Sequence, residues 1–358
     1  MKRNYPVGIQ NFEKIRSGNY CYIDKTELIY KLVKSGQYYF LSRPRRFGKS
    51  LLISTIEAYF QGKKELFEGL AMEALETEWT EYPILHLDLN AQKYDTPESL
   101  YSILNDALCA WEAMYETRPS ETTLSLRFQG VIQRAAEKWG RNVVILIDEY
   151  DKPMLQAIGN EALLTDYRNT LKAFYGVMKS CDRYIKFALL TGVTKFSKVS
   201  VFSDLNNLMD ISIDERFASL CGITEEELFT NFQEDIIELG QENKLTEEET
   251  KAELKKMYDG YHFAEESEDI YNPFSLLNTF AKMRFGSYWF ETGTPTFLVE
   301  LLKHSRYDLH RLTEEMASAD SLPKGMPIMV MHSNNPNPKC ERQIQMPPKN
   351  IQRIFIST

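Results

Sequence analysis

The chain has 358 residues, a hydrophobic fraction of 43% and a formal net charge of −9. This length accommodates one large domain and a smaller one, because single hydrophobic cores stop growing near ~250–300 residues. The apolar fraction excludes a disordered chain, and the negative charge argues against nucleic-acid binding by bulk electrostatics.

The sequence contains no segment suited to a bilayer and no dedicated metal site. Its longest clean apolar run is Val143–Ile147, far short of the ~20 residues that a membrane-spanning helix needs. The five cysteines are scattered without a CxxC pair, a pattern that favours a reducing, cytoplasmic location over disulfides or zinc. The five histidines lack ligand-type spacing, so we expect a metal to arrive with a nucleotide.

Strand-like and helix-like patterns alternate through the first two thirds of the chain. Strands are predicted at residues 38–41, 83–89, 143–147, 185–190 and 209–213, and helices at 49–60, 97–117, 125–138 and 161–179. The third run is continuously β-branched or aliphatic, which is typical of a central parallel strand buried on both faces. We therefore predict an α/β core over residues 1–213, with a central parallel sheet of about five strands flanked by helices.

A smaller, mostly helical domain is predicted over residues 214–318. Thr224 to Glu227 and Thr246 to Glu249 both have the form of a capping box, in which a hydroxyl and a carboxylate satisfy each other's free amides. We interpret these acidic clusters as capping groups rather than metal ligands. Residues 319–358 form a divergent, disordered tail in this prediction, because six of the fourteen prolines fall between residues 322 and 358.

The segment from Ser42 to Ser50, Ser-Arg-Pro-Arg-Arg-Phe-Gly-Lys-Ser, lies between a predicted strand and a predicted helix. Loop amides and a helix N-terminus at such a junction bind phosphate, so the segment predicts the phosphate loop of a P-loop NTPase. Gly48 would allow close approach of the backbone, Lys49 would reach the β and γ oxygens, and Ser50 would ligate Mg²⁺. The residues expected to bind ATP are Arg45, Arg46, Phe47, Gly48, Lys49 and Ser50.

The loop departs from the GxxxxGK[ST] pattern at Arg43, which stands where the first glycine belongs. An arginine there requires an ordinary negative φ. The three arginines of the loop leave two readings open. One guanidinium, of Arg43, Arg45 or Arg46, could stabilise phosphate charge or reach a neighbouring protomer. Alternatively, all three pair with acidic groups on the protein's own surface.

The apolar run at 143–147 ends in Asp148 and Glu149, an arrangement known as Walker B. Asp148 is expected to hold the Mg²⁺ shell, and Glu149 to orient and polarise the attacking water. The alternative is a strand that simply ends in solvent. Asp151 competes with Glu149 for the role of base, but we expect Asp151 to cap the helix that begins near Pro153.

A third element is Thr191, which follows the predicted strand at 185–190. In a P-loop ATPase with an additional central strand, a hydroxyl at this edge lies between the metal-binding acid and the γ-phosphate. A threonine after a strand is otherwise an ordinary turn residue. We therefore list Thr191 with Lys49 and Glu149 as candidate catalytic residues.

Several motifs together resemble a bacterial AAA-ATPase-like family. They include Tyr22 to Thr26, Arg43 to Ser50, Leu146 to Pro153, Leu190 to Ser197 and, further on, Ser203 to Leu208, Tyr271 to Pro273 and Gly293 to Pro295. The resemblance covers roughly residues 5–318 and makes Arg43 a family trait. It implies ATP rather than GTP as the nucleotide.

Family members similar to this chain usually continue into a PD-(D/E)XK nuclease-like domain. Such a core needs an Asp and a [DE]-x-Lys, whereas the sole acidic residue after Asp320 is Glu341. The expectation is therefore a truncated or frame-shifted product that lacks this domain. Nucleic acid is a partner by family association alone, and a homo-oligomer or a protein partner is also left open.

Three functions remain at this point. The first is MgATP hydrolysis coupled to conformational control of a partner or of the missing domain. The second is a nucleotide-dependent scaffold or switch with little turnover. The third is a P-loop kinase, which Glu149 and the lack of an arginine-rich lid make less favourable.

Overall fold

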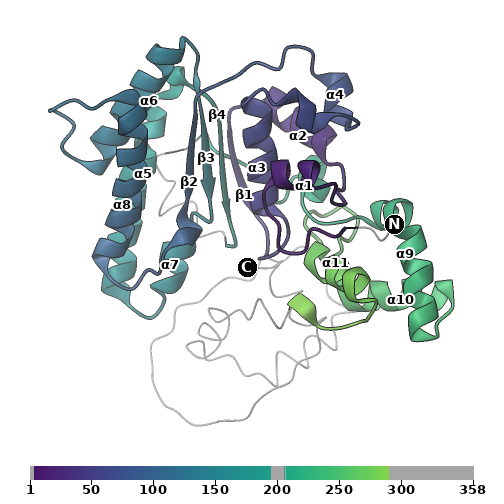
Figure 1. Ribbon diagram of the computed structural model, residues 1–358. Helices are drawn as coiled ribbons and strands as arrows, with labels where there is room; N and C mark the ends of the chain where they lie inside the picture. The colour runs from purple at the N-terminus through teal and green to yellow at the C-terminus, as the bar shows by residue number, and fades with distance from the viewer. Residues whose placement is uncertain (1–3, 195–204, 206, 290–358) are drawn as a thin grey trace, which may run out of the picture.

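A computed structural model describes residues 4–194, 205 and 207–289 (Figure 1). Five strands form one parallel sheet in the order β2-β3-β4-β1-β5. Their bounds are β1 Tyr38–Ser42, β2 Ile84–Asp88, β3 Val143–Asp148, β4 Ile185–Gly192 and β5 Met209–Asp210. The predicted α/β fold is confirmed, and β4 is the additional strand that separates β1 from β3.

Helices cover both faces of the sheet (Figure 1). On one face lie α5 Pro97–Tyr115, α6 Leu124–Trp139, α7 Lys152–Gln156 and α8 Glu161–Ser180, and on the other α1 Phe12–Ser17, α2 Thr26–Ser35, α3 Lys49–Phe60 and α4 Ala71–Leu75. Short 3-10 helices follow at η1 Lys64–Phe67, η2 Leu89–Ala91, η3 Asp182–Tyr184 and η4 Glu215–Leu220.

The strands face two separate hydrophobic cores. Ile145 and Ile147 of β3 pack with the α5, α6 and α8 side, whereas Val144 and Leu146 pack with the α2 and α3 side. Successive side chains of a strand point to opposite faces. The continuous apolar run of β3 is thus explained by burial on both sides.

The helical part contains α9 Glu225–Asn243, α10 Glu247–Tyr258 and α11 Pro273–Lys282. Both predicted capping boxes are present. The hydroxyl of Thr224 accepts the Glu227 amide at 3.1 Å, and the Glu227 carboxylate accepts the Thr224 amide at 2.9 Å. These acidic clusters are therefore confirmed as capping groups.

The N-terminal segment is shared between the core and the helical part. Cys21 is buried in the cluster formed by α9, α10 and α11, and Tyr5 and Ile23 pack against that cluster. Lys25, just before α2, forms an ion pair with Glu227 of α9 at 2.6 Å. The domain boundary at residues 213 and 214 stays a prediction, and the predicted tail at 319–358 lies outside the described residues.

The fifth strand is shorter than predicted. It spans Met209–Asp210 rather than residues 209–213. The Asp210 carboxylate accepts the Ser212 amide at 2.9 Å, and the Ser212 hydroxyl accepts the Ser42 amide at 2.8 Å. Side chains thus replace the backbone ladder after Ile211, whose amide still donates to Phe40. In the described part of the chain, no helix is both long and apolar enough to span a membrane.

Candidate functional site

The predicted phosphate loop, residues 43–48, joins the end of β1 to the start of α3. Gly48 adopts φ 99° immediately before the helix, a conformation that costs glycine little. Arg46 is also left-handed at φ 66°, whereas Arg43 is not among the described residues with positive φ. The expectation of an ordinary backbone at Arg43 is confirmed, and the left-handed positions of the loop, Arg46 and Gly48, lie further along.

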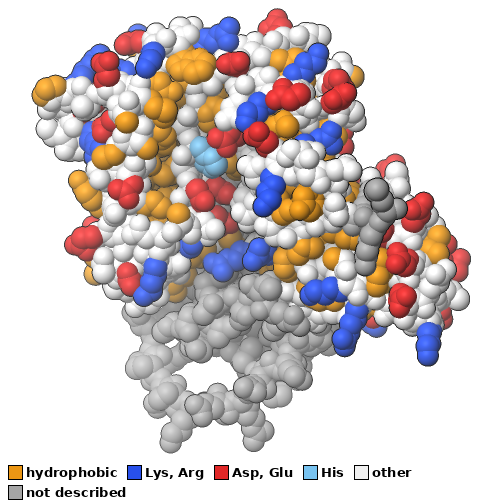
Figure 2. All heavy atoms as spheres, viewed as in Figure 1, with side chains coloured by type: hydrophobic (Ala, Val, Ile, Leu, Met, Phe, Trp, Pro, Cys, Tyr) orange, Lys and Arg blue, Asp and Glu red, His pale blue; other side chains and the backbone are white. Residues whose placement is uncertain are grey.

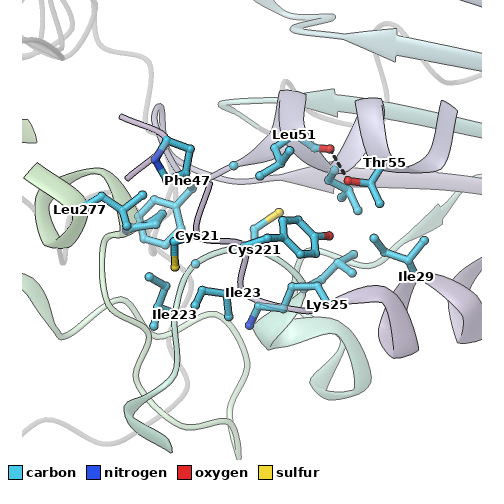
Figure 3. A pocket seen from close by; sticks show the side chains of 17 residues that line it. Cys21, Ile23, Lys25, Ile29, Phe47, Leu51, Thr55, Cys221, Ile223 and Leu277 are labelled. Atoms are coloured by element: carbon cyan, nitrogen blue, oxygen red, sulfur yellow. Dashed lines mark hydrogen bonds between the residues drawn. The ribbon is translucent and has the colours of Figure 1, made fainter. Parts of the chain in front are cut away.

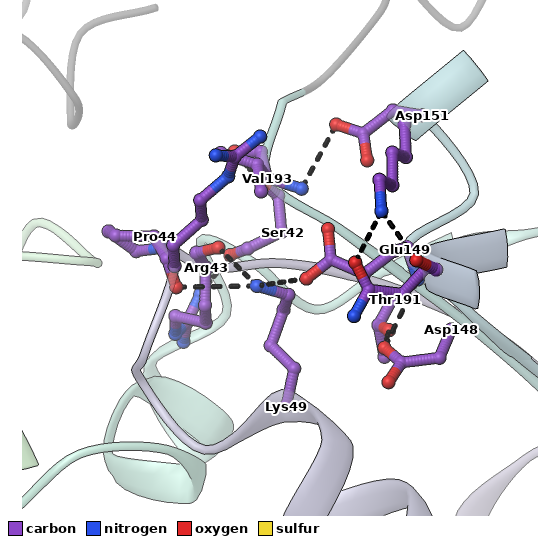
Figure 4. Close-up of polar contacts among 12 residues, drawn as sticks. Ser42, Arg43, Pro44, Lys49, Asp148, Glu149, Asp151, Thr191 and Val193 are labelled. Carbon is purple, nitrogen blue, oxygen red and sulfur yellow. Dashed lines mark hydrogen bonds and ion pairs between the residues drawn. The ribbon is translucent and has the colours of Figure 1, made fainter. Parts of the chain in front are cut away.

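Lys49 is buried at the centre of the site, with 3% of its surface exposed. Its ammonium group donates hydrogen bonds to the carbonyls of Arg43 at 3.1 Å and Pro44 at 3.3 Å. The same nitrogen lies 3.1 Å from a Glu149 carboxylate oxygen (Figure 4). The start of α3 and the end of β3 are therefore joined by one ion pair.

Asp148 and Thr191 meet on neighbouring strands. Asp148, at the end of β3, is 4% exposed. Its Oδ1 accepts the hydroxyl of Thr191, which is fully buried near the end of β4. Oδ1 also accepts the Glu149 amide at 3.1 Å. The central position of β4 thus places a hydroxyl directly on the acid of the adjacent strand.

Glu149 has a left-handed backbone with φ 55°. A non-glycine residue in this region costs on the order of 1–3 kcal/mol, and such strain clusters at functional sites. The conformation is held from both sides, by the bond from its amide to Asp148 and by the bond from the Tyr150 amide to the Thr191 carbonyl at 2.9 Å. The structure therefore brings Lys49, Asp148, Glu149 and Thr191 together at one edge of the sheet.

The arginines of the loop have different surroundings. Arg43 is 1% exposed and donates to backbone carbonyls, so it neither faces the solvent nor pairs with a surface acid. Arg46 is exposed and lies with its guanidinium 5.0 Å from the centre of the Phe274 ring. Arg45 is half-buried and accepts the Trp289 indole N–H on its carbonyl at 2.9 Å.

The expectation that Asp151 caps a helix is wrong. Asp151 does occupy the position before α7, but its side chain makes no capping hydrogen bond. Its Oδ2 instead accepts the amides of Val193 at 3.0 Å and Thr194 at 2.6 Å, together with the Thr194 hydroxyl. The turn after β4 supplies these donors, so the carboxylate holds that turn. Complete burial, followed by the charge of Glu149, raises the pKa of Asp151 to about 6.

Two adjoining cavities open beside the loop. The first, about 710 Å³ and open to solvent, is lined by the loop, the N-terminal segment, Glu149 and α11. These residues are Pro6, Val7, Gly8, Ile9, Gln10, Arg46, Gly48, Lys49, Ser50, Leu51, Glu149, Pro273, Phe274 and Leu277. Its lining thus includes three charged side chains, of Arg46, Lys49 and Glu149, among apolar residues.

The second cavity, about 640 Å³, is mainly apolar (Figure 3). Its walls include Cys21, Ile23, Phe47, Cys221 and Ile223. The two cavities share a border of Pro6, Gly48, Leu51, Pro273 and Leu277. Charged and apolar spaces therefore meet at the N-terminus of α3.

Acidic side chains gather in the hollow between the two halves of the face shown in Figure 2, with basic side chains directly below them. Asp88 ends β2 in register with Asp148. Partial burial of its carboxylate, followed by the negative charge of Asp148, raises the pKa of Asp88. Two acids therefore lie side by side at this edge of the sheet.

Three contributors to this site were missed by sequence reasoning. Asp88 carried a usable signal, because an acid at the end of a parallel strand lies at the same edge as Asp148. The start of α11 carried a weaker signal, because Tyr271 to Pro273 is one of the motifs that resemble the family. The segment from Pro6 to Gln10 carried none, because it has neither periodicity nor a charged group.

The donor atoms suit magnesium brought by a nucleotide. Ser50 supplies a hydroxyl in the first turn of α3, and Asp148 a carboxylate, both hard oxygen ligands of the kind that Mg²⁺ takes. Within residues 4–194, 205 and 207–289, no group of three or more His, Cys, Asp or Glu could hold a metal ion by itself. The fit is therefore to an ion that keeps phosphate oxygens and waters among its ligands.

A family model described as "predicted AAA-ATPase" matches residues 6–202, more than half of the chain. The chain belongs to this predicted AAA-ATPase family. The match includes the loop at 43–48, the acids at the end of β3 and Thr191.

One curated relative, described as an uncharacterized protein in the vnfD 5' region of Azotobacter chroococcum mcd 1, is 39% identical over 319 residues. The alignment covers 88% of this chain and 59% of the relative, so the chain spans less than two thirds of that protein's length. No solved structure matches the chain.

Proposed function

We propose that this predicted AAA-ATPase family member binds MgATP and hydrolyses it at the edge formed by β1, β4 and β3. The observation that carries the proposal is the 3.1 Å ion pair between Lys49 and Glu149, next to the hydrogen-bonded Asp148 and Thr191. A lysine in a strand-loop-helix turn, facing an acid pair across an additional central strand, is the arrangement that phosphoryl transfer to water requires. Family membership supports nucleotide binding.

Each side chain has a defined task in this proposal. Lys49 leaves the Arg43 and Pro44 carbonyls and binds the β and γ oxygens. Ser50 and Asp148 would hold Mg²⁺, which supplies neutralisation of charge on the phosphate oxygens when bound. Glu149, released from Lys49, orients and polarises the attacking water. Thr191 keeps Asp148 oriented through its hydroxyl.

The two cavities divide the nucleotide in the same proposal. The triphosphate lies in the charged cavity on Gly48, Lys49 and Ser50, and the adenine base enters the apolar cavity behind it. Apolar walls with few polar groups are typical of sites for flat heteroaromatic ligands. Residues from the helical part, Pro273 and Leu277, border both spaces, so bound nucleotide would contact both parts of the chain.

Phosphate release from MgATP tests the proposal in the wild type, Lys49→Ala and Glu149→Gln. Glu149→Gln should bind ATP but lose turnover by about 10²–10³-fold, the scale for loss of one preorganised group. Lys49→Ala should lose binding as well. Lys31→Ala is the matched control, because Lys31 is an exposed lysine on α2 whose ion pair with Glu27 lies on the surface. Equal turnover in the wild type and Lys49→Ala would refute hydrolysis at this site.

A second candidate is a nucleotide-dependent switch with little turnover. It is favoured by the same ion pair, since Lys49 holds the carboxylate that hydrolysis needs for water. A switch of this kind would bind ATP in the wild type and in Glu149→Gln, but not in Lys49→Ala. Its turnover would be negligible in the wild type and unchanged in Glu149→Gln.

The wider setting follows from the ATPase proposal. We place the activity in the cytoplasm, on the scattered cysteine pattern. Nucleotide turnover would control the conformation of a protein partner or of further sequence, which includes the length that the curated relative has beyond the aligned region. A homo-oligomer or a nucleic acid as partner is a further proposal, and co-sedimentation with and without ATP distinguishes them.

A further inference from the structure

Arg43 replaces the first glycine of the usual loop with a buried anchor. Its guanidinium donates to four backbone carbonyls, at 2.9 Å to Ser42 and Ser212 and at 3.3 Å to Phe217 and Ala218. The guanidinium also lies 4.0 Å from the centre of the Phe263 ring. A cation over an aromatic face is attracted by the negative charge of that face, and more strongly in a desolvated site. The start of the loop is thus tied to η4 and to the segment after α10.

Phe47, at the other end of the loop, packs against the same segment. It is 1% exposed, and its ring meets Tyr261 edge-on at 4.5 Å and Phe263 at 5.4 Å. These residues form a small cluster of their own with Ala218, Ala264 and Ile270. The cluster is separate from the two cores of the sheet, so it is devoted to the loop and its neighbours.

Two further loop residues, Arg45 and Arg46, also contact aromatic side chains of the helical part. Arg46 lies over the ring of Phe274, and the Arg45 carbonyl accepts the Trp289 indole. Four of the six loop residues therefore contact aromatic side chains of the helical part. We call these side chains the aromatic cradle, which consists of Tyr261, Phe263, Phe274 and Trp289.

The ligand-binding atoms and the cradle share one short stretch of backbone. Lys49 donates to the carbonyls of Arg43 and Pro44, and the Arg43 side chain lies against Phe263. When Lys49 turns to a phosphate, both carbonyls lose their donor and the peptide units must reorient or gain new partners. The change reaches Phe263 through a single residue.

We infer that Tyr261 and Phe263 are positioning residues for the phosphate loop, and that nucleotide binding is thereby coupled to the segment from Tyr258 to Tyr271. The inference rests on the proposed nucleotide site and adds the route by which the helical part responds. Coupling is reciprocal: if bound nucleotide orders the segment, a looser segment binds nucleotide more weakly. The coupling requires two states of Lys49: bound to the loop carbonyls, as in this structure, and bound to phosphate.

The test combines binding with hydrogen exchange in the whole chain. Binding of Mg²⁺ and ATPγS is measured by calorimetry, and amide exchange of residues 258–271 is measured with and without that ligand. Variants are Phe263→Leu, which removes the aromatic face, and Phe263→Tyr, which keeps it. Phe128→Leu is the control, because Phe128 is a buried ring stacked on Phe174 at 4.4 Å in the helical layer beyond the sheet.

Nucleotide should slow exchange at 258–271 in the wild type, Phe263→Tyr and Phe128→Leu. Phe263→Leu should lose this protection, with a Kd raised about 10-fold and a KM raised more than kcat falls. A loss of stability alone would affect Phe128→Leu equally. Unchanged Kd and protection in Phe263→Leu, or no protection in a wild type that binds, overturns the coupling alone. A wild type that fails to bind ATPγS overturns the proposed function and this inference with it.

Discussion

The ammonium nitrogen of Lys49 lies 3.1 Å from a carboxylate oxygen of Glu149, and it also donates to two carbonyls of its own loop. A lysine ammonium group has three N–H donors. Two of them donate to the loop carbonyls, and the ion pair with Glu149 gives the ammonium group a third partner, so an incoming phosphate must displace protein groups before it binds Lys49. Glu149 and the two loop carbonyls therefore compete with the nucleotide for Lys49.

Removing that competition should tighten nucleotide binding. In Glu149→Gln the charge of the partner is gone, and the Kd for MgATP should fall by about 2- to 5-fold, the scale of a weak ion pair. Calorimetry at fixed salt measures the effect. Glu137→Gln, an exposed acid on α6, serves as the control. Weaker binding by Glu149→Gln would show that the pair does not compete.

Restoring the glycine of the usual loop pattern should harm this protein. Arg43→Gly leaves four backbone carbonyls without their donor and removes the contact with Phe263, which should lower the free energy of unfolding by about 3 kcal/mol or more. Urea unfolding measures this loss. Arg118→Ala, at an exposed position, should leave it unchanged. If Arg43→Gly is as stable as the wild type, the hydrogen bonds of Arg43 and its contact with Phe263 do not stabilise the protein.

Gly222 should resist substitution for two reasons that a control can separate. Its φ is +92°, and a methyl group would overlap Ile270 and lie 3.0 Å from the Phe47 ring. Gly140 has φ +61° with open space around it. Gly140→Ala should cost only the backbone strain of about 1–2 kcal/mol. Gly222→Ala should lower the free energy of unfolding by more than Gly140→Ala does. It should also raise the Kd for MgATP, because Phe47 is displaced. Equal losses of stability for the two variants in urea unfolding would exclude the packing effect.

The stability of the protein should carry a pH dependence from Asp151. Burial raises its pKa from 3.8 to about 6, so the folded state binds this proton more tightly than the unfolded state. Its stabilising contribution is complete below pH 3.8 and is lost as the pH rises through about 6. In Asp151→Asn a carbonyl still accepts the Val193 and Thr194 amides without this penalty.

Relative to the wild type, Asp151→Asn should therefore gain on the order of 2 kcal/mol between pH 4.5 and 7. Urea unfolding over that pH range measures the difference, with Asp166→Asn as an exposed control. A difference between wild type and Asp151→Asn that stays constant with pH would mean that Asp151 titrates normally.

Strand ends were the part of the site that the sequence could predict. Asp148, Glu149 and Thr191 lie at or beside strand ends, Lys49 begins the helix after the loop that follows β1, and parallel strands bring their ends to one edge. The α/β fold followed from the same pattern. These inferences are local, because each needs only the residues on either side of a strand end.

The rest depended on groups far away in the chain. Arg43 meets Phe263 more than two hundred residues later, and no periodicity links them. Asp151 lies at the position of a capping residue before α7. Its carboxylate instead accepts three hydrogen bonds from the turn after β4, so it does not cap the helix. β5 ended early because the side chains of Asp210 and Ser212 replaced its ladder.

The position of β4 between β1 and β3 also determines when β1 can pair with another strand during synthesis. Among the described strands, β1 pairs with β4 and β5, and the earlier of these two, β4, leaves the ribosome roughly 140 residues after β1. At ~5–20 residues per second, the aromatic strand Tyr38–Ser42 waits about 7–30 s without a neighbour. During that time it is an unpaired apolar edge, the kind of segment that chaperones bind and that aggregates when they do not. The strand that bears the phosphate loop is thus a part of the nascent chain that needs protection until β4 is made.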